Sequence, residues 1–594
     1  MVKILLKEVK EFKKESILTP LCMIFEVIFE TFIPLCSGAI VDNGVKQANM
    51  PYVWKMGAVM LALALGGLIS GCLGGIFGAK AATGFARNLR KKMYDNIQTF
   101  SFSNIDKFST AGLVTRLTTD VTNIQNAYQM ILRMAFRAPI SLIVAMIMAY
   151  SISPKIANVY LVAVIFLATI VIILMISAMK YFRQVFKKYD DLNESVQENT
   201  NAIRVVKAYV REDYEVSKFK KASENIYKMF VKAESKVVIN MPVMMFTIYG
   251  CIISISYVGA HMISAGALTT GKLMTLLQYC MNILFSLMML SMIFVMVSMS
   301  MASAERIAEV IKEEPDITNP ENPVMTVANG DIEFKDVDFS YAVDGKGEAV
   351  LKDINLHIRS GETIGIIGPT GSAKSSLVNL ISRLYDVTAG ELLVGGKNVK
   401  EYDLQVLRDQ VAVVLQKNVL FSGTILDNLR WGNKDATLEE CQAACKIACA
   451  DEFISGFENG YDTYIEQGGS NVSGGQKQRL CIARALLKKP KILILDDSTS
   501  AVDTATDAKI RKGFLEEIPD TTKIIIAQRI SSIQAADRII VMEEGRINGI
   551  GSHDELIKTN EIYKDVYESQ NGGSGDFDEV GDATKSQNTE GGDR

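Results

Sequence analysis

Six long apolar stretches fill the first 300 positions of this chain of 594 residues. Each has about 20 or more mostly uncharged residues, the length that a helix needs to cross the hydrocarbon core of a bilayer. Because no water reaches that core, a spanning segment must satisfy its backbone hydrogen bonds internally, as a helix does. We therefore predict six transmembrane helices, at residues 17–41, 53–78, 131–151, 156–179, 237–262 and 273–300.

Lysine and arginine are concentrated in two of the connections between these stretches, at residues 79–130 and 180–236. The other connections are short and carry little positive charge. Positively charged loops stay on the cytoplasmic side of a membrane. Both long loops and both termini are therefore predicted to be cytoplasmic.

The two long loops keep a helical pattern, which continues through residues 84–100 and 190–219. Helices of that length extend well beyond a bilayer, so the turning points near 103–107 and 208–214 are expected far from the membrane. Those turns would contact a soluble domain. The candidate residues for this contact, which the family resemblance described below makes coupling residues, are Ser103, Asp106, Tyr209 and Arg211.

The second half of the chain has a different, soluble pattern. Pro315, Pro320 and Pro323 mark a linker. From residue 331 onward, short β-branched runs alternate with helical segments, which favours an α/β domain with a largely parallel sheet. The expected strands lie at 332–334, 363–367, 411–415, 492–495, 523–527 and 538–542.

Charge and cysteine usage narrow the remaining function classes. The net charge of −4 and the pI of about 5.8 give no basic surface of the kind that nucleic-acid binding requires, so no nucleic acid is expected as a partner. The nine cysteines are scattered and suggest no disulfide framework. This usage is typical of a cytosolic soluble domain.

A glycine-rich loop follows the expected strand at 363–367, and a helix is predicted to begin near Lys374. In such a loop, successive backbone N–H groups and the helix N-terminus bind the phosphates of a nucleotide. Lys374 would reach the outer phosphates of ATP, and Ser375 would ligate Mg²⁺. The candidate ATP-binding residues of this loop are Gly368, Pro369, Thr370, Gly371, Ser372, Ala373, Lys374, Ser375 and Ser376.

Two further features concern the same site. Ala373 stands where such a loop usually has glycine, and its methyl group crowds the approach to phosphate unless its φ is negative. The apolar run at 492–495 ends in Asp496, which a buried strand would deliver to the edge where Mg²⁺ binds. The fold class is therefore a membrane all-α six-helix transmembrane domain followed by an α/β P-loop nucleotide-binding domain.

Between these two pieces, the sequence Asn-Val-Ser-Gly-Gly-Gln at 471–476 resembles the signature of the ATP-binding cassette family. Other family motifs occur in the expected order and spacing. Tyr341 resembles the aromatic that stacks on adenine, and Gln416 resembles the glutamine that contacts Mg²⁺ and couples to the membrane helices. The candidate signature and interface residues are Ser473, Gly474, Gly475, Gln476 and Asp503.

The resemblance implies an exporter-type half-transporter. Its expected parts are a transmembrane domain at 1–305, a linker at 306–330, an ATP-binding cassette at 331–568 and a disordered tail at 569–594. Two cassettes of this family sandwich each ATP between one chain's phosphate loop and the other chain's signature. The chain must therefore dimerise with a second half-transporter, and its second loop would cross to the partner's cassette.

Two positions depart from the pattern that the family uses for hydrolysis. Asp497 stands where glutamate usually orients the attacking water, and Gln528 stands where histidine usually contacts the γ-phosphate. A carboxylate shorter by one methylene is misplaced by about 1 Å, which costs on the order of 10²-fold in rate. Since the signature is nearly intact, we expect a heterodimer in which this chain holds the weak site. The alternative is a homodimer with two slow sites.

The membrane stretches suggest residues that contact cargo. Glu26 and Glu30 share a helix face, and an intramembrane carboxylate normally faces a cavity or a partner. Attraction of cationic cargo and a structural role both remain open for this pair. Met288, Met292 and Met296 lie near one face of the last stretch, where adaptable side chains suit hydrophobic cargo or ordinary packing.

The expected function is ATP-driven, multidrug-type export of small hydrophobic or cationic molecules across a bacterial plasma membrane. The lipid bilayer and a second half-transporter are the expected partners, and ATP and Mg²⁺ are the expected cofactors. Two alternatives remain: a homodimeric exporter of lipid or peptide, and a largely non-catalytic ATP-binding subunit.

Overall fold

The computed structural model describes residues 1–342 and 347–571. The chain forms two compact units. The first comprises Met1–Thr99 and Ser109–Glu313, and the second comprises Phe100–Phe108 and the chain from Glu314 onward. A nine-residue piece of the first long loop therefore folds with the soluble half of the chain.

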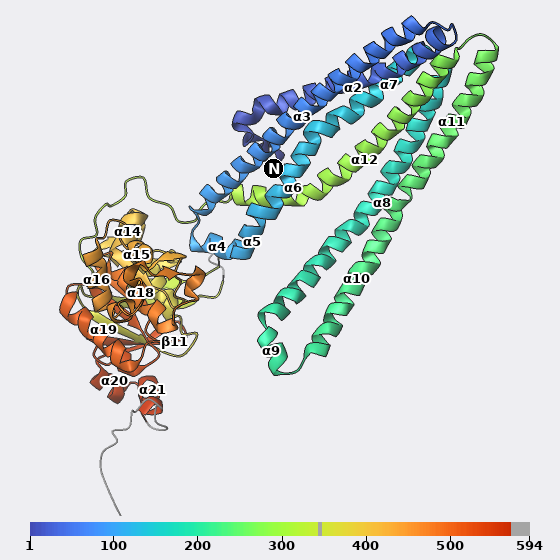
Figure 1. The fold of residues 1–594 in the computed structure, drawn as a ribbon. Helices are drawn as coiled ribbons and strands as arrows, with labels where there is room; N and C mark the ends of the chain where they lie inside the picture. The colour runs from blue at the N-terminus through green and yellow to red at the C-terminus, as the bar shows by residue number, and fades with distance from the viewer. Residues whose placement is uncertain (343–346, 572–594) are drawn as a thin grey trace, which may run out of the picture. The chain divides into compact units, whose positions relative to one another are not determined.

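Long helices make up the first unit (Figure 1). Six helical segments of its described residues are long and apolar enough to cross a membrane, which confirms the predicted six-helix architecture. The principal helices are α2 (Lys13–Ala39), α3 (Met50–Ile97), α6 (Val121–Met130), α7 (Phe136–Ile152), α8 (Pro154–Asn201), α10 (Glu212–Val238), α11 (Asn240–Ser264) and α12 (Thr270–Lys312). The shorter ones are α1 (Val2–Lys7), η1 (Lys10–Phe12), η2 (Ile40–Val45), α5 (Thr110–Thr115), η3 (Arg116–Asp120), η4 (Ile131–Ala135) and α9 (Ile203–Ala208).

Two helix ends differ from the sequence-based boundaries. The helical pattern at 190–219 is interrupted, because α8 ends at Asn201 and α10 begins only at Glu212. Between them lie α9 and a turn in which Val210 has a left-handed backbone, with φ of 51°. Helix α12 continues to Lys312, so the linker that we placed from residue 306 begins later.

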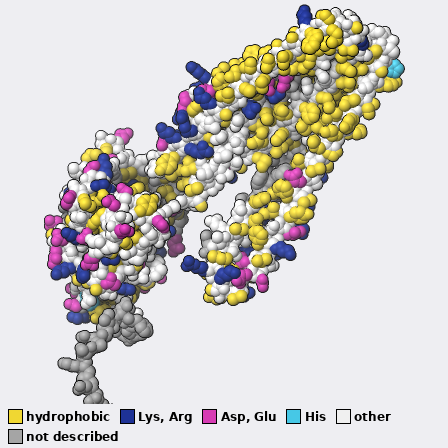
Figure 2. Space-filling view, viewed as in Figure 1, with side chains coloured by type: hydrophobic (Ala, Val, Ile, Leu, Met, Phe, Trp, Pro, Cys, Tyr) yellow, Lys and Arg dark blue, Asp and Glu magenta, His cyan; other side chains and the backbone are white. Residues whose placement is uncertain are grey.

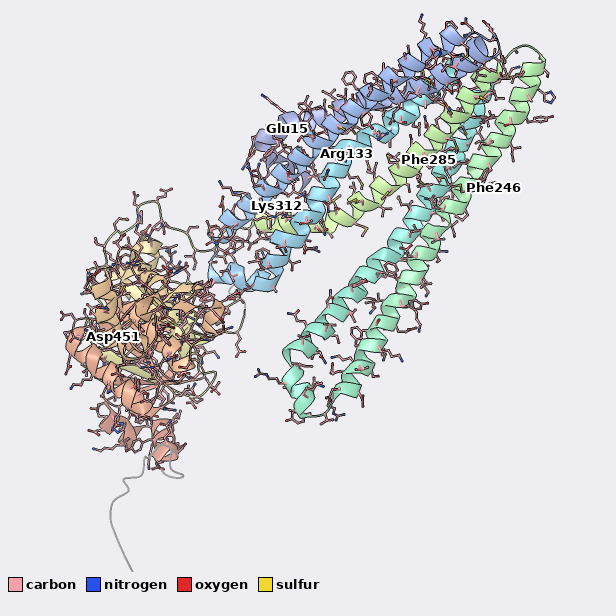
Figure 3. The ribbon with its side chains drawn as sticks, in the orientation of Figure 1. Glu15, Arg133, Phe246, Phe285, Lys312 and Asp451 are labelled. Atoms are coloured by element: carbon pink, nitrogen blue, oxygen red, sulfur yellow. The ribbon has the colours of Figure 1, made fainter. Side chains whose placement is uncertain are left out.

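Apolar side chains cover the outer surface of these helices (Figure 2). Phe246 on α11 is 75% exposed and Phe285 on α12 is 45% exposed, and both side chains are labelled in Figure 3. Large exposed apolar side chains are unfavourable in water but match the hydrocarbon of a bilayer. The surface of the first unit therefore agrees with a multi-pass membrane protein.

Helices α2 and α12 approach each other closely at one crossing. A methyl group added to Gly271 would overlap the carbonyl oxygen of Gly38, which belongs to the backbone and has no room to yield. Glycine at such a crossing lets two membrane helices pack at backbone distance. The crossing therefore depends on the absence of a side chain at Gly271.

We expect Gly271→Ala to destabilise the protein by about 1–3 kcal/mol, because the added methyl group must push the two helices apart. Thermal unfolding of the purified protein in detergent measures the change. Gly75→Ala on α3 is the matched control, since nothing lies within 4 Å of its added methyl group. Equal stability of the two variants would contradict the close crossing.

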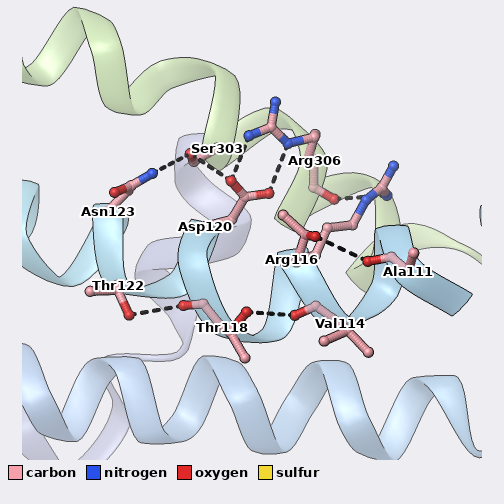
Figure 4. A network of polar contacts seen from close by, with 10 residues as sticks. Ala111, Val114, Arg116, Thr118, Asp120, Thr122, Asn123, Ser303 and Arg306 are labelled. Atoms are coloured by element: carbon pink, nitrogen blue, oxygen red, sulfur yellow. Dashed lines mark hydrogen bonds and ion pairs between the residues drawn. The ribbon is translucent and has the colours of Figure 1, made fainter. Parts of the chain in front are cut away.

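A buried carboxylate links η3 to α12 (Figure 4). Asp120 is only 1% exposed. It accepts hydrogen bonds from the Ser303 hydroxyl at 2.8 Å and from Arg306 Nε at 2.7 Å. An ion pair at 2.9 Å between Arg116 and Glu309 lies beside it. Both interactions connect the first loop to the last turns of α12.

The second unit is built on three sheets. Five parallel strands and one antiparallel edge strand form the largest, in the order β12-β11-β3-β10-β9-β6. A four-stranded antiparallel sheet has the order β2-β1-β4-β5, and β7 pairs with β8. The strands are β1 (Ile332–Phe339), β2 (Leu351–Ile358), β3 (Thr363–Ile367), β4 (Ala389–Val394), β5 (Lys397–Asn398), β6 (Val411–Val414), β7 (Gly423–Thr424), β8 (Tyr464–Ile465), β9 (Ile492–Asp496), β10 (Thr522–Ile526), β11 (Arg538–Glu543) and β12 (Arg546–Gly551).

Helices flank the parallel sheet, as an α/β fold requires. Two buried apolar clusters, which include Ile366 and Leu495 respectively, fill the space between the layers. The helices are α4 (Phe102–Phe108), α13 (Lys374–Ile381), η5 (Val399–Glu401), α14 (Leu404–Gln410), α15 (Ile425–Arg430), α16 (Leu438–Ile447), α17 (Asp451–Ile454), η6 (Gly460–Asp462), η7 (Gln467–Gly469), α18 (Gly474–Leu486), α19 (Thr504–Glu517), η8 (Ile530–Ser532), α20 (His553–Thr559) and α21 (Glu561–Asn571).

The last helix changes one sequence-based boundary. We placed the start of a disordered tail at residue 569, but residues 569–571 form the last residues of α21. The rest of that predicted tail, 572–594, lies outside the described residues.

Candidate functional site

The phosphate loop connects β3 to α13. The helix begins at Lys374, and the loop before it turns through two glycines with positive φ, Gly368 at 156° and Gly371 at 88°. The Lys374 ammonium donates hydrogen bonds to the carbonyl oxygens of Gly368 and Pro369, both at 2.8 Å. Burial lowers the pKa of Lys374, although Asp496 and Asp497 lie nearby and oppose this change.

Ala373 adopts a left-handed backbone, with φ of 69° and ψ of 23°. The sequence left open a negative φ, which would accommodate the methyl group at this position. The structure instead shows the conformation that glycine prefers, which costs a residue with a Cβ about 1–3 kcal/mol. The loop therefore keeps its geometry at the cost of local backbone strain.

Two neighbouring carboxylates lie at the carboxyl end of β9. Asp496, the last residue of the strand, is 6% exposed and lies beside the Ser375 side chain. Burial raises the pKa of Asp496, and burial also raises the pKa of Asp497. Because β9 pairs in parallel with β10 and β10 with β3, these carboxylates and the phosphate loop share one edge of the sheet.

Asp497 is held by two side-chain amides. Gln528 follows β10 and donates from Nε2 to Asp497 Oδ2 at 2.8 Å. Gln416 follows β6 and donates to the same oxygen at 3.5 Å, which is at the limit of a hydrogen bond. The structure thus brings together three residues that the sequence singled out separately.

Tyr341 contacts helix α13. Its hydroxyl is 2.9 Å from the Ser376 hydroxyl, and its ring packs edge-on against Tyr385 with centroids 5.0 Å apart. Tyr385 in turn donates a hydrogen bond to Asp106 on α4 at 2.8 Å. Sequence reasoning missed Tyr385, because no motif marks an aromatic whose role depends on tertiary packing.

The signature residues open helix α18. Ser473 caps the helix, and a reciprocal pair of hydrogen bonds joins Ser473 and Gln476 through their side chains and backbone N–H groups. Such a capping box fixes the first turn of the helix, and Gly474 and Gly475 are the first two residues of that turn. Asp503 caps α19, where its carboxylate accepts from the Thr506 N–H at 2.9 Å.

The loop fits the triphosphate of ATP. Gly371 has no atom within 4 Å of a would-be Cβ, so the backbone is open on that side, and Lys374 points its ammonium at oxygen acceptors of the loop. The Ser375 hydroxyl beside the Asp496 carboxylate supplies the oxygen ligands that Mg²⁺ prefers. Thr370 and Gly371 are exposed, as a contact with nucleotide requires.

The carboxylates proposed for cargo are paired within the chain. Arg137 of α7 contacts both oxygens of Glu30 at 2.8 Å and Glu26 Oε1 at 3.1 Å. An arginine paired with two carboxylates offsets one of their two negative charges, so less negative charge remains for a cationic molecule. The pairing favours the structural alternative for Glu26 and Glu30.

A cavity of about 800 Å³ lies between α8, α11 and α12. Its lining is mainly apolar and includes Leu174, Phe294 and Val295, with Lys180 and Glu305 as charged members. Met288, Met292 and Met296 do not line it. Met299 and Met301, farther along α12, do line it.

The candidate coupling residues fall in different units. Ser103 lies on α4 in the second unit, where its hydroxyl donates to Asp316 at 2.6 Å. Tyr209 and Arg211 lie in the turn between α9 and α10 of the first unit, and Tyr209 is 75% exposed.

Comparisons with known proteins agree with this architecture. A family model described as "ABC transporter transmembrane region" matches residues 16–299, and one described as "ABC transporter" matches residues 351–500. The uncharacterized ABC transporter ATP-binding protein YfiB of Bacillus subtilis is 36% identical over 553 residues, which cover 93% of this chain and 96% of YfiB. An ATP-dependent lipid A-core flippase of Desulfotalea psychrophila is 32% identical over 489 residues, which cover 82% and 84%.

A solved structure has the same fold over nearly the whole chain. It is a bacterial Atm1-family ABC exporter with ATP bound, and it matches with a TM-score of 0.81 at 23% identity. The match covers 94% of this chain and 99% of that exporter.

Proposed function

This chain belongs to the ABC transporter family, and on that premise we propose that it is one half of an ATP-driven exporter of hydrophobic or amphipathic small molecules. The proposed location is a bacterial plasma membrane, with the cassette and both termini in the cytoplasm. The basic loops at 79–130 and 180–236 support this orientation.

The residue types at positions 497 and 528, whose side chains meet at 2.8 Å, carry the proposal of a weak ATP site. The usual glutamate would extend one methylene farther toward an attacking water, and the usual histidine can carry a positive charge. Asp497 is shorter and is engaged by a neutral amide instead. We infer that this chain's own site binds ATP firmly and hydrolyses it slowly.

The roles of the other site residues follow from their positions. Lys374 and the N–H groups of the phosphate loop would hold the outer phosphates, and Tyr341 would stack on adenine. Ser375, Gln416 and Asp496 would hold Mg²⁺, which when bound neutralises charge on the phosphates.

The intact signature supports a partner with a stronger site. The N-terminus of α18 presents exposed N–H groups and the positive end of a helix dipole, which suits the γ-phosphate of an ATP held by another chain. A heterodimer would then have one competent and one weak sandwich. A homodimer would have two weak ones.

Two turns are proposed to carry motion from the cassettes to the membrane helices. Contacts from Tyr341 through Tyr385 to Asp106 support such a role for α4. The turn with Tyr209 and Arg211 would dock on the partner's cassette. A groove of about 360 Å³ on this chain's cassette, bordered by Phe421 and Trp431, is the candidate site for the equivalent turn of the partner.

The cavity between α8, α11 and α12 supports a hydrophobic or amphipathic cargo. Its apolar walls match such molecules, and its two charged members carry opposite signs. A lipid cargo is a second candidate, which the likeness to the lipid A-core flippase favours.

The proposal predicts that the purified chain is labelled by a photoreactive ATP analogue and that Lys374→Ala reduces this labelling at least about 10-fold, because the ammonium no longer holds the phosphates. The wild-type chain should hydrolyse ATP slowly. Lys488→Ala, at a lysine of the same cassette outside the loop, is the control. Labelling that is independent of Lys374, or fast turnover by a lone monomer, would overturn the proposal.

Transport is tested with the chain reconstituted in vesicles, alone and together with the half-transporter encoded beside it. ATP-dependent accumulation of an amphipathic dye only with the partner is the expected result. Movement of a fluorescent phospholipid by the chain alone would instead support the homodimeric lipid transporter.

A further inference from the structure

The C-terminal helix α21 ends against the segment that carries Gln528. The Gln570 side chain makes two hydrogen bonds to the main chain of this segment. Its Oε1 accepts from the Ile530 N–H at 2.9 Å, and its Nε2 donates to the Gln528 carbonyl at 2.8 Å. One side chain therefore binds the backbone on both sides of Arg529.

This segment lies outside regular structure. Strand β10 ends at Ile526 and η8 begins at Ile530, so the sheet ladder does not hold the backbone of Gln528. The Gln570 side chain, with one acceptor and one donor, supplies backbone hydrogen bonds that the sheet does not provide there.

Burial of other α21 side chains anchors the helix that carries Gln570. Tyr563 on α21 is fully buried, and its hydroxyl is 2.7 Å from His553 Nδ1 on α20. Val566 and Tyr567 of the same helix pack against the apolar cluster that contains Ile530. Packing of α21 therefore determines where Gln570 meets the segment.

The bonded segment directs Gln528 toward the carboxylate of the ATP site. With its own carbonyl held by Gln570, Gln528 reaches Asp497 Oδ2 at 2.8 Å. A shift of this backbone by about 1 Å would break that bond, and misplacements of this size cost up to about 10²-fold in rate.

We propose that Gln570 is a positioning residue for ATP hydrolysis, which sets the place of Gln528 and makes turnover at this site depend on the seating of the C-terminal helix. Gln570 acts through the Gln528 backbone, to which it is hydrogen-bonded. The inference rests on the proposed function only in taking Gln528 as part of the ATP site.

The test replaces Gln570 in the full-length protein. Gln570→Met keeps the length of the side chain and removes both hydrogen bonds. Gln570→Glu keeps the acceptor for the Ile530 N–H but removes the donor to the Gln528 carbonyl. Ser569→Ala, at the preceding exposed residue, is the matched control.

We expect Gln570→Met to lower kcat for ATP about 5- to 10-fold with KM changed less than about twofold, since the phosphate loop is untouched. The kcat of Gln570→Glu should lie between the values of the wild type and of Gln570→Met. In a Gln528→Ala background the Met substitution should have no further effect. An equal loss with and without Gln528 would overturn the proposal.

Hydrogen exchange of peptides that span 523–535 gives a readout that needs no turnover. Loss of the bond to Ile530 should speed exchange of its amide about fivefold in Gln570→Met and leave it unchanged in Ser569→Ala. Unchanged exchange in Gln570→Met would refute the positioning role. Failure of the proposed function is distinct, because it would appear as ATP labelling independent of Lys374 in the parent protein.

Discussion

Replacing Asp497 by glutamate should raise the ATP turnover of this chain about 10- to 100-fold. The added methylene carries the carboxylate past its present position beside Gln528 and toward the place of the attacking water. Phosphate release by the purified protein at saturating MgATP measures the effect. Asp497→Glu combined with Lys374→Ala should show no turnover, which assigns the gain to this chain's own site.

The matched control is Asp435→Glu, the same substitution at an exposed aspartate of the same cassette. It should leave turnover unchanged. Adding Gln528→His to Asp497→Glu should increase turnover further, because imidazolium can carry charge beside the γ-phosphate. Turnover that stays constant or falls in Asp497→Glu would mean that the aspartate is already placed for catalysis, and the weak-site proposal would be wrong.

Replacing Arg306 by methionine should destabilise the transmembrane unit by about 2–3 kcal/mol, because Asp120 loses its charged partner, although solvent screens the half-exposed arginine. The substitution leaves the Asp120 carboxylate, which is 1% exposed, buried with only the Ser303 hydroxyl as a hydrogen-bond donor from α12. Thermal unfolding in detergent should show a large fall in Tm.

A second substitution should restore the stability that Arg306→Met removes. Asp120→Leu together with Arg306→Met removes both charges and should recover most of the stability, because an apolar pair of similar volume carries no desolvation cost. Glu309→Gln is the control, since it breaks the partly exposed pair with Arg116 and should cost about 0–1 kcal/mol. If Arg306→Met is as stable as Glu309→Gln, the ion pair between Arg306 and Asp120 does not stabilise the fold.

The sequence was sufficient wherever local pattern determines local structure. Six apolar stretches predicted the membrane architecture, and the alternation after residue 331 predicted the α/β domain. The loop around Lys374 was recognisable because its glycines and the residues that follow them determine the local backbone conformation. Asp497 and Gln528 follow neighbouring strands, so their meeting at one sheet edge follows from the strand order.

Other features depend on tertiary packing and had no local signal. The partner of Glu26 and Glu30 is Arg137 on another helix, and pairing of that kind leaves no spacing in the sequence. Which residues of α12 border the cavity depends on the positions of α8 and α11, and methionine spacing alone does not reveal those positions. Gln570 fell within the predicted disordered tail, although it lies on α21 and reaches back to Gln528.

Because it includes helix α4, the second unit is built from two separate segments of the chain. Residues 100–108 belong to the same compact unit as the chain beyond Glu314, and Phe102 and Asp106 both contact Tyr385. A fragment that begins at the linker would therefore lack residues 100–108 and would expose the Tyr385 side chain that they contact. Any study of the cassette in isolation needs that nine-residue peptide restored, in trans or by a graft.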